Sequence, residues 1–262
     1  MAHIDHHPPG NFCWIELATT DQKAAKSFYG ALFGWTPQDS PMGPDEFYTM
    51  FKLEGRDAAA GYTLRADQKA QGVPPHWMIY IAVNNADETV GKAQQLGGTV
   101  LCAAMDVMEY GRMAVVQDPT GAYFCIWQPK LNKGIGIGRV PNTLCWADLS
   151  TPDPQRAGDF YSGLFGWHLM KDEKDPSGYL HIQNGEPFIG GIPPAKHRQP
   201  GVPPHWLPYF EVADVDATAT RAKDMGANLY LAPMTMEGVG RMAVIADPQG
   251  AVFAIFKSAR HS

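Results

Sequence analysis

The sequence predicts an α+β fold in which four βαβββ modules form two tandem domains. The first observation is a repeat: FCWIELATTDQKAAKSFYGALFGW at 12–35 returns as LCWADLSTPDPQRAGDFYSGLFGW at 144–167. The second is that GVPPHW and a segment of the form DPxGxxF each occur once more in the second copy. The third is that strand-like alternation precedes a helical pattern twice within each copy. Two modules per copy, and four in the chain, account for all three observations.

The repeats divide the chain of 262 residues into two domains. With 45% hydrophobic residues, each domain has enough apolar side chains to bury a core of its own. The segment GIGIG between the copies lacks the strand before it and the helix after it that a phosphate-binding loop needs, so we interpret it as a linker. The predicted parts are a flexible tail at 1–10, domain 1 at 11–130, a linker at 131–141 and domain 2 at 142–258.

The first module begins with alternating residues at 12–19 and continues with a helix. Asp21 stands at the N-cap position, apolar residues recur at helical spacing through Leu32, and Gly34 occupies the position of a left-handed C-terminal cap. The second copy repeats this arrangement, with Asp153 as the cap and Pro154 at the first helical position, where its fixed φ is favourable.

The second module of each copy follows the same plan. A strand-like segment at 77–83 leads into a helical pattern that Gly97 and Gly98 end. The turn signals DPTG and DPQG separate the last two strands of their copies. The remaining strand-like segments of the first copy are 47–53, 58–64, 99–103, 112–117 and 122–127.

Composition argues against several classes of partner. Charged residues make up 18% of the chain and the formal net charge is -6, which does not favour binding to nucleic acid or to an anionic membrane. No apolar run approaches the roughly 20 residues that span a bilayer. The N-terminus lacks the basic and apolar regions of a secretory signal, and the four cysteines form no CxxC pair. We therefore expect a cytoplasmic protein with reduced thiols.

This plan, with FYxxLFGW after a capped helix and DPxGxxF before the last strand, resembles the vicinal oxygen chelate superfamily. The superfamily includes glyoxalase I, bleomycin-resistance proteins and extradiol dioxygenases, and the resemblance covers nearly the whole chain, once per copy. It implies that paired modules form a curved mixed sheet around a cavity that takes a small molecule. It also implies that one chain builds what smaller relatives assemble as a dimer, and we expect a monomer or a homodimer.

The resemblance also implies where a metal would bind, because enzymes of the superfamily hold a divalent ion with His, Gln or Glu. The matching positions are Trp14, Met78 and Cys125 in the first copy and Trp146, Leu207 and Ala254 in the second. Hard divalent ions prefer oxygen ligands, and zinc prefers Cys, His or carboxylate, so neither set forms such a site. We therefore expect no metal cofactor.

A displaced metal site is the alternative, because a shift of two residues keeps the same face of a strand. Such a site would use Glu16 with His76 in the first copy and Asp148 with His205 in the second. Fe, Zn, Mn or Ni would be the bound ion.

Glu16 and Asp148 occupy equivalent positions within otherwise apolar strands. A carboxylate on an apolar face is costly unless it is paired, and such groups often have a raised pKa that suits a general base. The favoured interpretation is structural pairing with Arg112 and Arg241, which also recur between the copies. Catalysis by the two carboxylates is the alternative.

His76 and His205 follow Pro-Pro in both copies, which forces an extended chain before the strand. They are either positioned acid–base groups or ligands, or else histidines at a strand start that bond to the backbone. Tyr48 and Tyr179 are expected in the core.

The remaining candidates line the cavity. The expected ligand-binding side chains are Trp14, Trp146, Met78, Tyr80, Tyr209, Arg112, Arg241 and Cys125. Cys125 is more consistent with a buried, inert thiol than with a nucleophile, because the second copy has Ala254 in its place.

Three functions follow from these residues. The favoured one is a protein of the bleomycin-resistance type that binds a small organic molecule in a cavity without metal. The second is a metal-dependent lyase, isomerase or dioxygenase with a displaced site. The third is a metal-free acid–base enzyme that uses Glu16 or Asp148 with a neighbouring His or Tyr.

Overall fold

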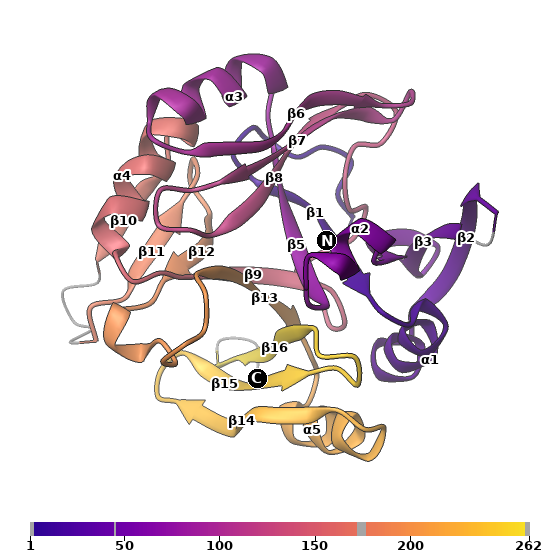
Figure 1. The fold of residues 1–262 in the computed structure, drawn as a ribbon. Coiled ribbons are helices and arrows are strands. Elements are labelled where there is room, and N and C mark those ends of the chain that lie inside the picture. The colour runs from indigo at the N-terminus through magenta and orange to yellow at the C-terminus, as the bar shows by residue number, and fades with distance from the viewer. Residues whose placement is uncertain (1–2, 45, 172–176, 260–262) are drawn as a thin grey trace.

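The computed structural model describes residues 3–44, 46–171 and 177–259. Its elements follow one another as four modules, each made of a strand, a helix and three further strands (Figure 1). The first module is β1 (Phe12–Thr19), α1 (Gln22–Phe33), β2 (Thr36–Gly43), β3 (Glu46–Leu53) and β4 (Arg56–Thr63). The second is β5 (His76–Ala82), α3 (Ala86–Gln95), β6 (Thr99–Val107), β7 (Gly111–Gln117) and β8 (Tyr123–Pro129), and the short helix α2 (Ala66–Ala70) joins the two.

The second copy repeats this order of elements. Its first module is β9 (Leu144–Ser150), α4 (Pro154–Phe165), β10 (His168–Lys171), β11 (Leu180–Gln183) and β12 (Phe188–Ile192). Its second is β13 (His205–Glu211), α5 (Val215–Asp224), β14 (Asn228–Met236), β15 (Gly240–Ala246) and β16 (Val252–Ser258), with the 3₁₀ turn η1 (Ala195–His197) at the place of α2. The predicted α+β fold of four modules is confirmed.

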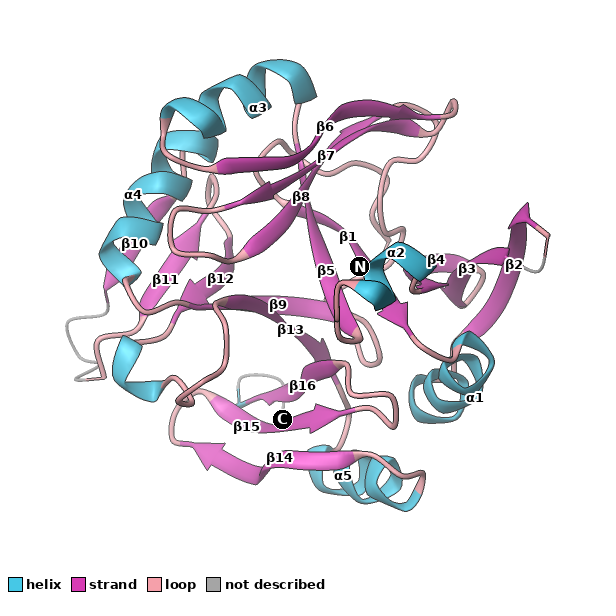
Figure 2. Cartoon of the chain, viewed as in Figure 1, coloured by secondary structure: helices cyan, strands magenta, loops and turns pink. Residues whose placement is uncertain are grey.

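Each domain contains one curved, mixed, eight-stranded sheet (Figure 2). The strand orders are β2-β3-β4-β1-β5-β8-β7-β6 and β10-β11-β12-β9-β13-β16-β15-β14. The first strands of the two modules, β1 and β5 or β9 and β13, lie antiparallel at the centre of their sheets. We call the face opposite α1 and α3, or opposite α4 and α5, the inner face of each sheet.

The predicted caps determine where the first helices begin and end. The Asp21 carboxylate accepts a hydrogen bond from the backbone N–H of Ala24 at 2.9 Å, and Gly34 ends α1 with φ of 72°. Asp153 and Gly166 do the same for α4. A left-handed φ favours glycine, which lacks the Cβ that would clash there.

The βαβββ plan requires a strand at the place of β2, but no residue range was predicted for it. It lies at the edge of its sheet, all of its residues are exposed, and it contains Pro37 and Pro41. An edge strand has no buried face to impose alternation, and it tolerates proline because one row of its N–H groups needs no partner in the sheet. The signals used for the other strands are therefore missing from it.

The composition suits two domains that are each able to bury a core, and in the structure the two largest hydrophobic clusters contain residues of both domains. One hydrophobic cluster joins α1 to the second domain, where Phe33 lies 5.1 Å from Phe210 and 5.9 Å from Phe253 between ring centroids. The other joins α4 to the first domain, where Tyr161 lies 5.4 Å from Phe124. Helix α1 contacts α5, and α3 contacts α4, along the same interface.

Two buried hydrogen bonds cross this interface in a symmetric manner. The Tyr29 hydroxyl donates to Asp247 at 2.8 Å, and the Tyr161 hydroxyl donates to Asp118 at 3.0 Å. The other carboxylate oxygen of each aspartate accepts from backbone N–H groups of its own DPxG turn. The two motifs that identify the repeat, FYxxLFGW and DPxGxxF, therefore hold the domains together.

The segments predicted as a tail and a linker lie against each other and against both sheets. The backbone N–H of Ile4 donates to Gly136 at 3.0 Å, and the His7 ring contacts the backbone oxygen of Ile135 at 2.9 Å. His7 is only 7% exposed. The N–H of Ile135 in turn donates to Cys13 in β1. The described part of the tail, 3–10, is thus packed against the linker, where we expected flexibility.

Candidate functional site

A carboxyl group with two tyrosine partners lies on the inner face of the first sheet. Glu16, in the middle of β1, accepts hydrogen bonds from the hydroxyl of Tyr48 at 2.6 Å and from that of Tyr80 at 3.0 Å. The indole N–H of Trp14 donates to the Tyr48 hydroxyl at 3.2 Å. We call these four residues the Glu16 cluster.

Strand register explains why the four side chains meet. In the antiparallel pair of β1 and β5, Trp14 lies opposite Tyr80 and Glu16 lies opposite Met78. On the other side of β1, Glu16 pairs with Ala60 in β4, and Ala60 pairs with Met50 in β3. Paired residues share a face of the sheet, and so do residues two apart, which brings Tyr48 to the same face.

Burial controls the ionisation of the Glu16 cluster. Loss of hydration raises the pKa of Glu16 above its ordinary value, and the hydrogen bonds from Tyr48 and Tyr80 oppose this only in part. Burial raises the pKa values of both tyrosines as well, and the neighbouring carboxylate adds to the rise. The tyrosines therefore stay protonated and act as donors, while the carboxyl group is easier to protonate than an exposed one.

The second sheet carries the equivalent Asp148 cluster. Asp148 accepts hydrogen bonds from the hydroxyls of Tyr179 at 2.5 Å and Tyr209 at 2.8 Å, and from the indole N–H of Trp146 at 3.0 Å. The same indole N–H also lies 2.9 Å from the Tyr179 hydroxyl. Asp148 is 7% exposed, and burial is the main cause of its raised pKa.

A histidine distinguishes the second cluster. The His181 ring lies 4.8 Å from the Tyr179 ring and 6.3 Å from the Trp146 ring between centroids. Burial raises the pKa of Asp148, the hydrogen bonds from Tyr179, Tyr209 and Trp146 oppose this rise, and the neighbouring His181 adds a smaller lowering effect. In the first sheet, register gives the corresponding place to Met50.

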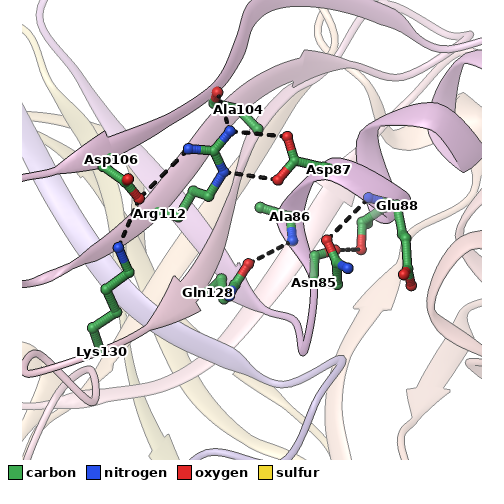
Figure 3. Close-up of polar contacts among 10 residues, drawn as sticks. Asn85, Ala86, Asp87, Glu88, Ala104, Asp106, Arg112, Gln128 and Lys130 are labelled. Atoms are coloured by element: carbon green, nitrogen blue, oxygen red, sulfur yellow. Dashed lines mark hydrogen bonds and ion pairs between the residues drawn. The ribbon is translucent and has the colours of Figure 1, made fainter.

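The expected pairing of Glu16 and Asp148 with arginine is wrong. Figure 3 shows that Arg112, on β7, instead binds Asp87 in the first turn of α3, with hydrogen bonds of 2.8 and 2.9 Å. Arg112 also donates to the backbone oxygen of Ala104 at 2.9 Å. These contacts tie β6 to α3 on the outside of the sheet, so Arg112 is not a ligand-binding residue of the inner face.

Arg241 has the equivalent place in the second domain. It binds Asp216, in the first turn of α5, with two hydrogen bonds of 2.6 Å, and it donates to Thr235 at 2.9 Å. The pKa values of Asp87 and Asp216 are lowered by the hydrogen bonds from their arginines. The two arginines recur because each copy uses the same structural contact.

The two histidines bond to the backbone, which is the structural alternative considered above. His76 Nδ1 lies 2.8 Å from the backbone oxygen of Pro74, and His205 Nδ1 lies 2.9 Å from that of Pro203. Burial lowers the pKa of both rings, so both are neutral at pH 7. Each histidine ring thus contacts the backbone oxygen of the proline two residues before it.

The other predicted lining residues lie on the inner faces. Tyr80 pairs with Cys125, and Tyr209 pairs with Ala254, so these side chains share a face with Glu16 and Asp148. Burial raises the pKa of the Cys125 thiol well above its ordinary value, which agrees with an inert thiol. Met78 is partly buried beside Glu16.

Tyr48 and Tyr179 are the functional candidates that sequence reasoning missed. Both were expected in the core, but each donates to the carboxylate of its cluster. The signal that identifies them is register: once β3 and β4 are paired, Tyr48 lies opposite Tyr62 and shares its face with Glu16. Tyr62 itself accepts a hydrogen bond from Gln68 of α2 at 3.1 Å, which places α2 beside this face.

The residues present do not fit the metal site that the resemblance implies. The positions of the expected ligands hold an indole, a thioether and a protonated thiol in the first sheet, and Trp146, Leu207 and Ala254 in the second. The displaced site is not assembled either, because Glu16 binds two tyrosines and His76 binds its own loop. Among the residues that the structure describes, no three His, Cys, Asp or Glu side chains form a metal-binding group.

Comparison with known proteins agrees with the fold. Residues 11–126 and 143–255 each match the model of the glyoxalase/bleomycin resistance protein/dioxygenase superfamily. The chain is 39% identical over 250 residues to "Putative glyoxylase CFP32" of Mycobacterium tuberculosis, covering 94% of both chains. It is 32% identical over 261 residues to "Anthracycline biosynthesis protein DnrV" of Streptomyces peucetius, covering 94% of this chain and 93% of the relative.

Solved structures have the same fold at low identity. An Mn(II)-bound glyoxalase from Novosphingobium aromaticivorans superposes with a TM-score of 0.65 at 18% identity, covering 98% of this chain and 83% of that one. The 2,3-dioxygenase LapB from Pseudomonas sp. KL28 has a TM-score of 0.61 at 17% identity, covering 98% of this chain and 93% of that one.

No helix in the described part of the chain is long and apolar enough to cross a membrane. The chain belongs to the glyoxalase/bleomycin resistance protein/dioxygenase superfamily.

Proposed function

We propose that this protein binds a small organic molecule on the inner face of its first domain, without a metal held by the protein. The observation that carries this proposal is the Glu16 cluster, in which one carboxyl group and two tyrosine hydroxyls converge at 2.6 and 3.0 Å on a partly buried face. The donor set at the superfamily's metal positions supports the metal-free part of the proposal, because Trp14 and Met78 are not ligands for a divalent ion.

The chemistry of the cluster suits a ligand with a carbonyl or hydroxyl oxygen. The tyrosines are donors over the whole physiological range because burial raises their pKa values. The raised pKa of Glu16 makes its carboxyl group easier to protonate than an exposed one, and a protonated carboxyl group can donate as well as accept a hydrogen bond. A ligand oxygen that replaces one tyrosine contact would therefore find a partner of the right kind.

The surrounding side chains suit an aromatic ligand. Strand register places Met50, Met78 and Met113 on the same inner face as Glu16, and all three are partly buried. Thioethers adapt to flat rings and make favourable sulfur–aromatic contacts. The name of the relative DnrV refers to anthracycline biosynthesis. We therefore infer a planar, oxygenated aromatic ligand of the anthracycline kind.

A titration with an anthracycline tests this proposal, with the ligand's own fluorescence as the signal and EDTA present throughout. Saturable binding is expected, and Glu16→Gln should weaken it about tenfold, which corresponds to about 1.4 kcal/mol. Glu109→Gln, at an exposed position, is the matched control and should leave binding unchanged. Equal affinities for both variants would contradict the role of Glu16.

An acid–base enzyme is the second candidate, favoured by the raised pKa of Glu16 beside the Tyr80 hydroxyl. Proton abstraction next to a carbonyl group is the reaction class that such a pair supports. Exchange of ligand C–H protons with solvent deuterium, followed by NMR, tests it. If exchange persists in both Glu16→Gln and Asp148→Asn, neither carboxyl group acts as the base.

A further inference from the structure

A cavity lies away from the Glu16 cluster, where the N-terminal segment and the linker meet β9 and β12. Its volume is about 230 Å³, smaller than the pockets that take drug-sized ligands. The side chains around it come from four separate segments of the chain. They are Ile4, His6, His7, Asn11, Phe12, Ile135, Gly138, Arg139, Leu144, Cys145, Trp146, Pro187 and Ile189. We call it the tail cavity.

The walls of the tail cavity are mostly apolar and carry no negative charge. Aliphatic and aromatic side chains such as Phe12, Leu144 and Ile189 form most of its lining, and none of its residues is Asp or Glu. Arg139 supplies a full positive charge. Within the described ranges, no carboxylate lies within ion-pair distance of this guanidinium.

Arg139 is an exposed residue that hydrogen bonds hold beside the cavity. Its guanidinium donates to the backbone oxygen of Phe188 at 3.1 Å, and its backbone N–H donates to Leu144 at 3.0 Å. Its φ of 58° lies in the left-handed region, which is unfavourable for a residue with a Cβ. The positive charge also stabilises the thiolate of Cys145 and so opposes the effect of burial on that pKa.

Two further polar groups border the cavity. The Asn11 side-chain oxygen accepts from Asn184 at 2.6 Å, so its amide N–H groups remain as donors. The His7 ring is neutral, because burial lowers its pKa, and its Nε2 contacts the backbone oxygen of Ile135. A neutral His7 must carry its proton on Nε2, since a carbonyl oxygen only accepts.

We propose that the tail cavity binds a small monocarboxylate with a compact apolar body, such as an aromatic acid. The apolar walls match the body, while the guanidinium of Arg139 and the amide of Asn11 match the carboxylate. A dicarboxylate or a phosphorylated compound is disfavoured, because the lining offers only one permanently charged partner. This ligand is separate from the one proposed for the inner face of domain 1.

The tail cavity is connected to the second domain's cluster through Trp146. This side chain lines the cavity, and its indole N–H donates to Asp148 at 3.0 Å and to Tyr179 at 2.9 Å. A ligand in the cavity would therefore lie beside the residue that donates to Asp148. Trp14 holds the equivalent position in the first domain and does not line this cavity.

Titration with sodium benzoate, followed by ¹H–¹⁵N NMR of the indole N–H groups, tests the proposal. The Trp146 signal is assigned with Trp146→Phe and the Trp14 signal with Trp14→Phe. Benzoate is expected to shift the Trp146 signal saturably and to leave the Trp14 signal in place. Benzyl alcohol, which has the same ring without the charge, should bind at least tenfold more weakly.

Two variants test the walls of the cavity. Arg139→Gln should weaken benzoate binding at least tenfold, whereas Lys133→Gln, an exposed charge in the same linker, should not change it. Ile4→Trp fills the cavity from the tail and should abolish binding even if Arg139→Gln folds poorly. Absence of a saturable shift, equal binding by Arg139→Gln and Lys133→Gln, or a shift confined to other indoles would each overturn the proposal.

Discussion

The Glu16 and Asp148 clusters are built on the same strands of equivalent sheets, yet they differ in how their carboxyl groups are satisfied. Glu16 is partly buried and accepts from two tyrosines. Asp148 has a side chain shorter by one methylene, is almost fully buried, and accepts from two tyrosines and from Trp146. The first cluster therefore has hydrogen-bonding capacity left for a ligand, while the second has used nearly all of its own.

The side chains around the two carboxyl groups also differ between the domains. The first inner face has Met50, Met78 and Cys125 at places where the second has His181, Leu207 and Ala254. Two copies within one chain thus keep the carboxyl–tyrosine pair and change what lies around it. The comparison supports the ligand-binding role proposed for the first cluster and a more structural role for the second.

The largest expected effect is on stability when the acceptor is removed from the second cluster. Asp148→Leu leaves the hydroxyls of Tyr179 and Tyr209 without their acceptor at an almost fully buried position, while Trp146 can still donate to Tyr179. It should lower the free energy of unfolding by about 3 kcal/mol. Glu16→Leu affects two donors at a more accessible position and should cost about 1 kcal/mol. Urea denaturation measures both values. Equal losses would mean that the two clusters do not differ in the way proposed.

The affinity for the ligand should depend more on Glu16 than on Asp148, which is the reverse of the order expected for stability. In the anthracycline titration, Glu16→Gln should weaken binding about tenfold, while Asp148→Asn should change it by less than about threefold. The reason is that Glu16 accepts two hydrogen bonds where Asp148 accepts three, and is more exposed, so it has capacity left for a ligand. A larger effect of Asp148→Asn would transfer the site to the second domain.

The pH dependence of stability follows from the raised pKa of Glu16. Because the folded state binds the Glu16 proton more tightly than the unfolded state does, protonated Glu16 favours folding. This contribution to the free energy of unfolding is fully present below the ordinary pKa of 4.5 and is lost as the pH rises through the folded-state pKa. Glu16→Gln has no proton to lose and so removes this pH-dependent loss. The loss amounts to about 1.4 kcal/mol for each unit by which folding raises the pKa of Glu16. The variant should therefore gain stability relative to the native chain as the pH rises above 4.5.

The same pH series separates the two clusters. Asp148→Asn should show the same direction of change, starting from the ordinary value of 3.8. Glu109→Gln is exposed and should show no trend of this kind. A difference between Glu16→Gln and the native chain that is constant with pH would show that folding does not raise the pKa of Glu16.

The smallest effects are expected outside the clusters, at Arg112 and Arg241. Lysine at either position keeps the charge but loses the paired hydrogen bonds to Asp87 or Asp216. Both variants should lower Tm slightly and by similar amounts, with a smaller effect in high salt because the pairs are exposed. If Arg112→Lys loses anthracycline binding, Arg112 belongs to the ligand site and the assignment made here is wrong.

Much of the fold was accessible from the sequence, because the repeat, the caps and the turns are local signals. Asp21, Gly34 and the DPxG turns act within a few residues of their positions, and the structure confirms them. The shared core was not accessible in this way. The contact of Tyr29 with Asp247 joins residues that only the packing of two domains brings together.

The candidate site was predictable in part for the same reason. Position within β1 and β9 identified Glu16 and Asp148 as unusual carboxyl groups on apolar strands. Their partners could not be chosen from spacing, because Tyr48 and Arg112 are both compatible with the pattern of the sequence. The register of β3 against β4 and the position of α3 over β7 decide between them.

The most direct test of the central claim is the metal content of the protein under conditions in which it binds its ligand. Protein with the exposed His3 and His6 replaced by Gln would be incubated with Fe, Zn, Mn or Ni, desalted, and titrated with the anthracycline before elemental analysis by mass spectrometry. The account predicts saturable binding that depends on Glu16, with far less than one equivalent of metal per chain. One equivalent of bound metal, required for binding and lost in Glu16→Gln, would contradict it.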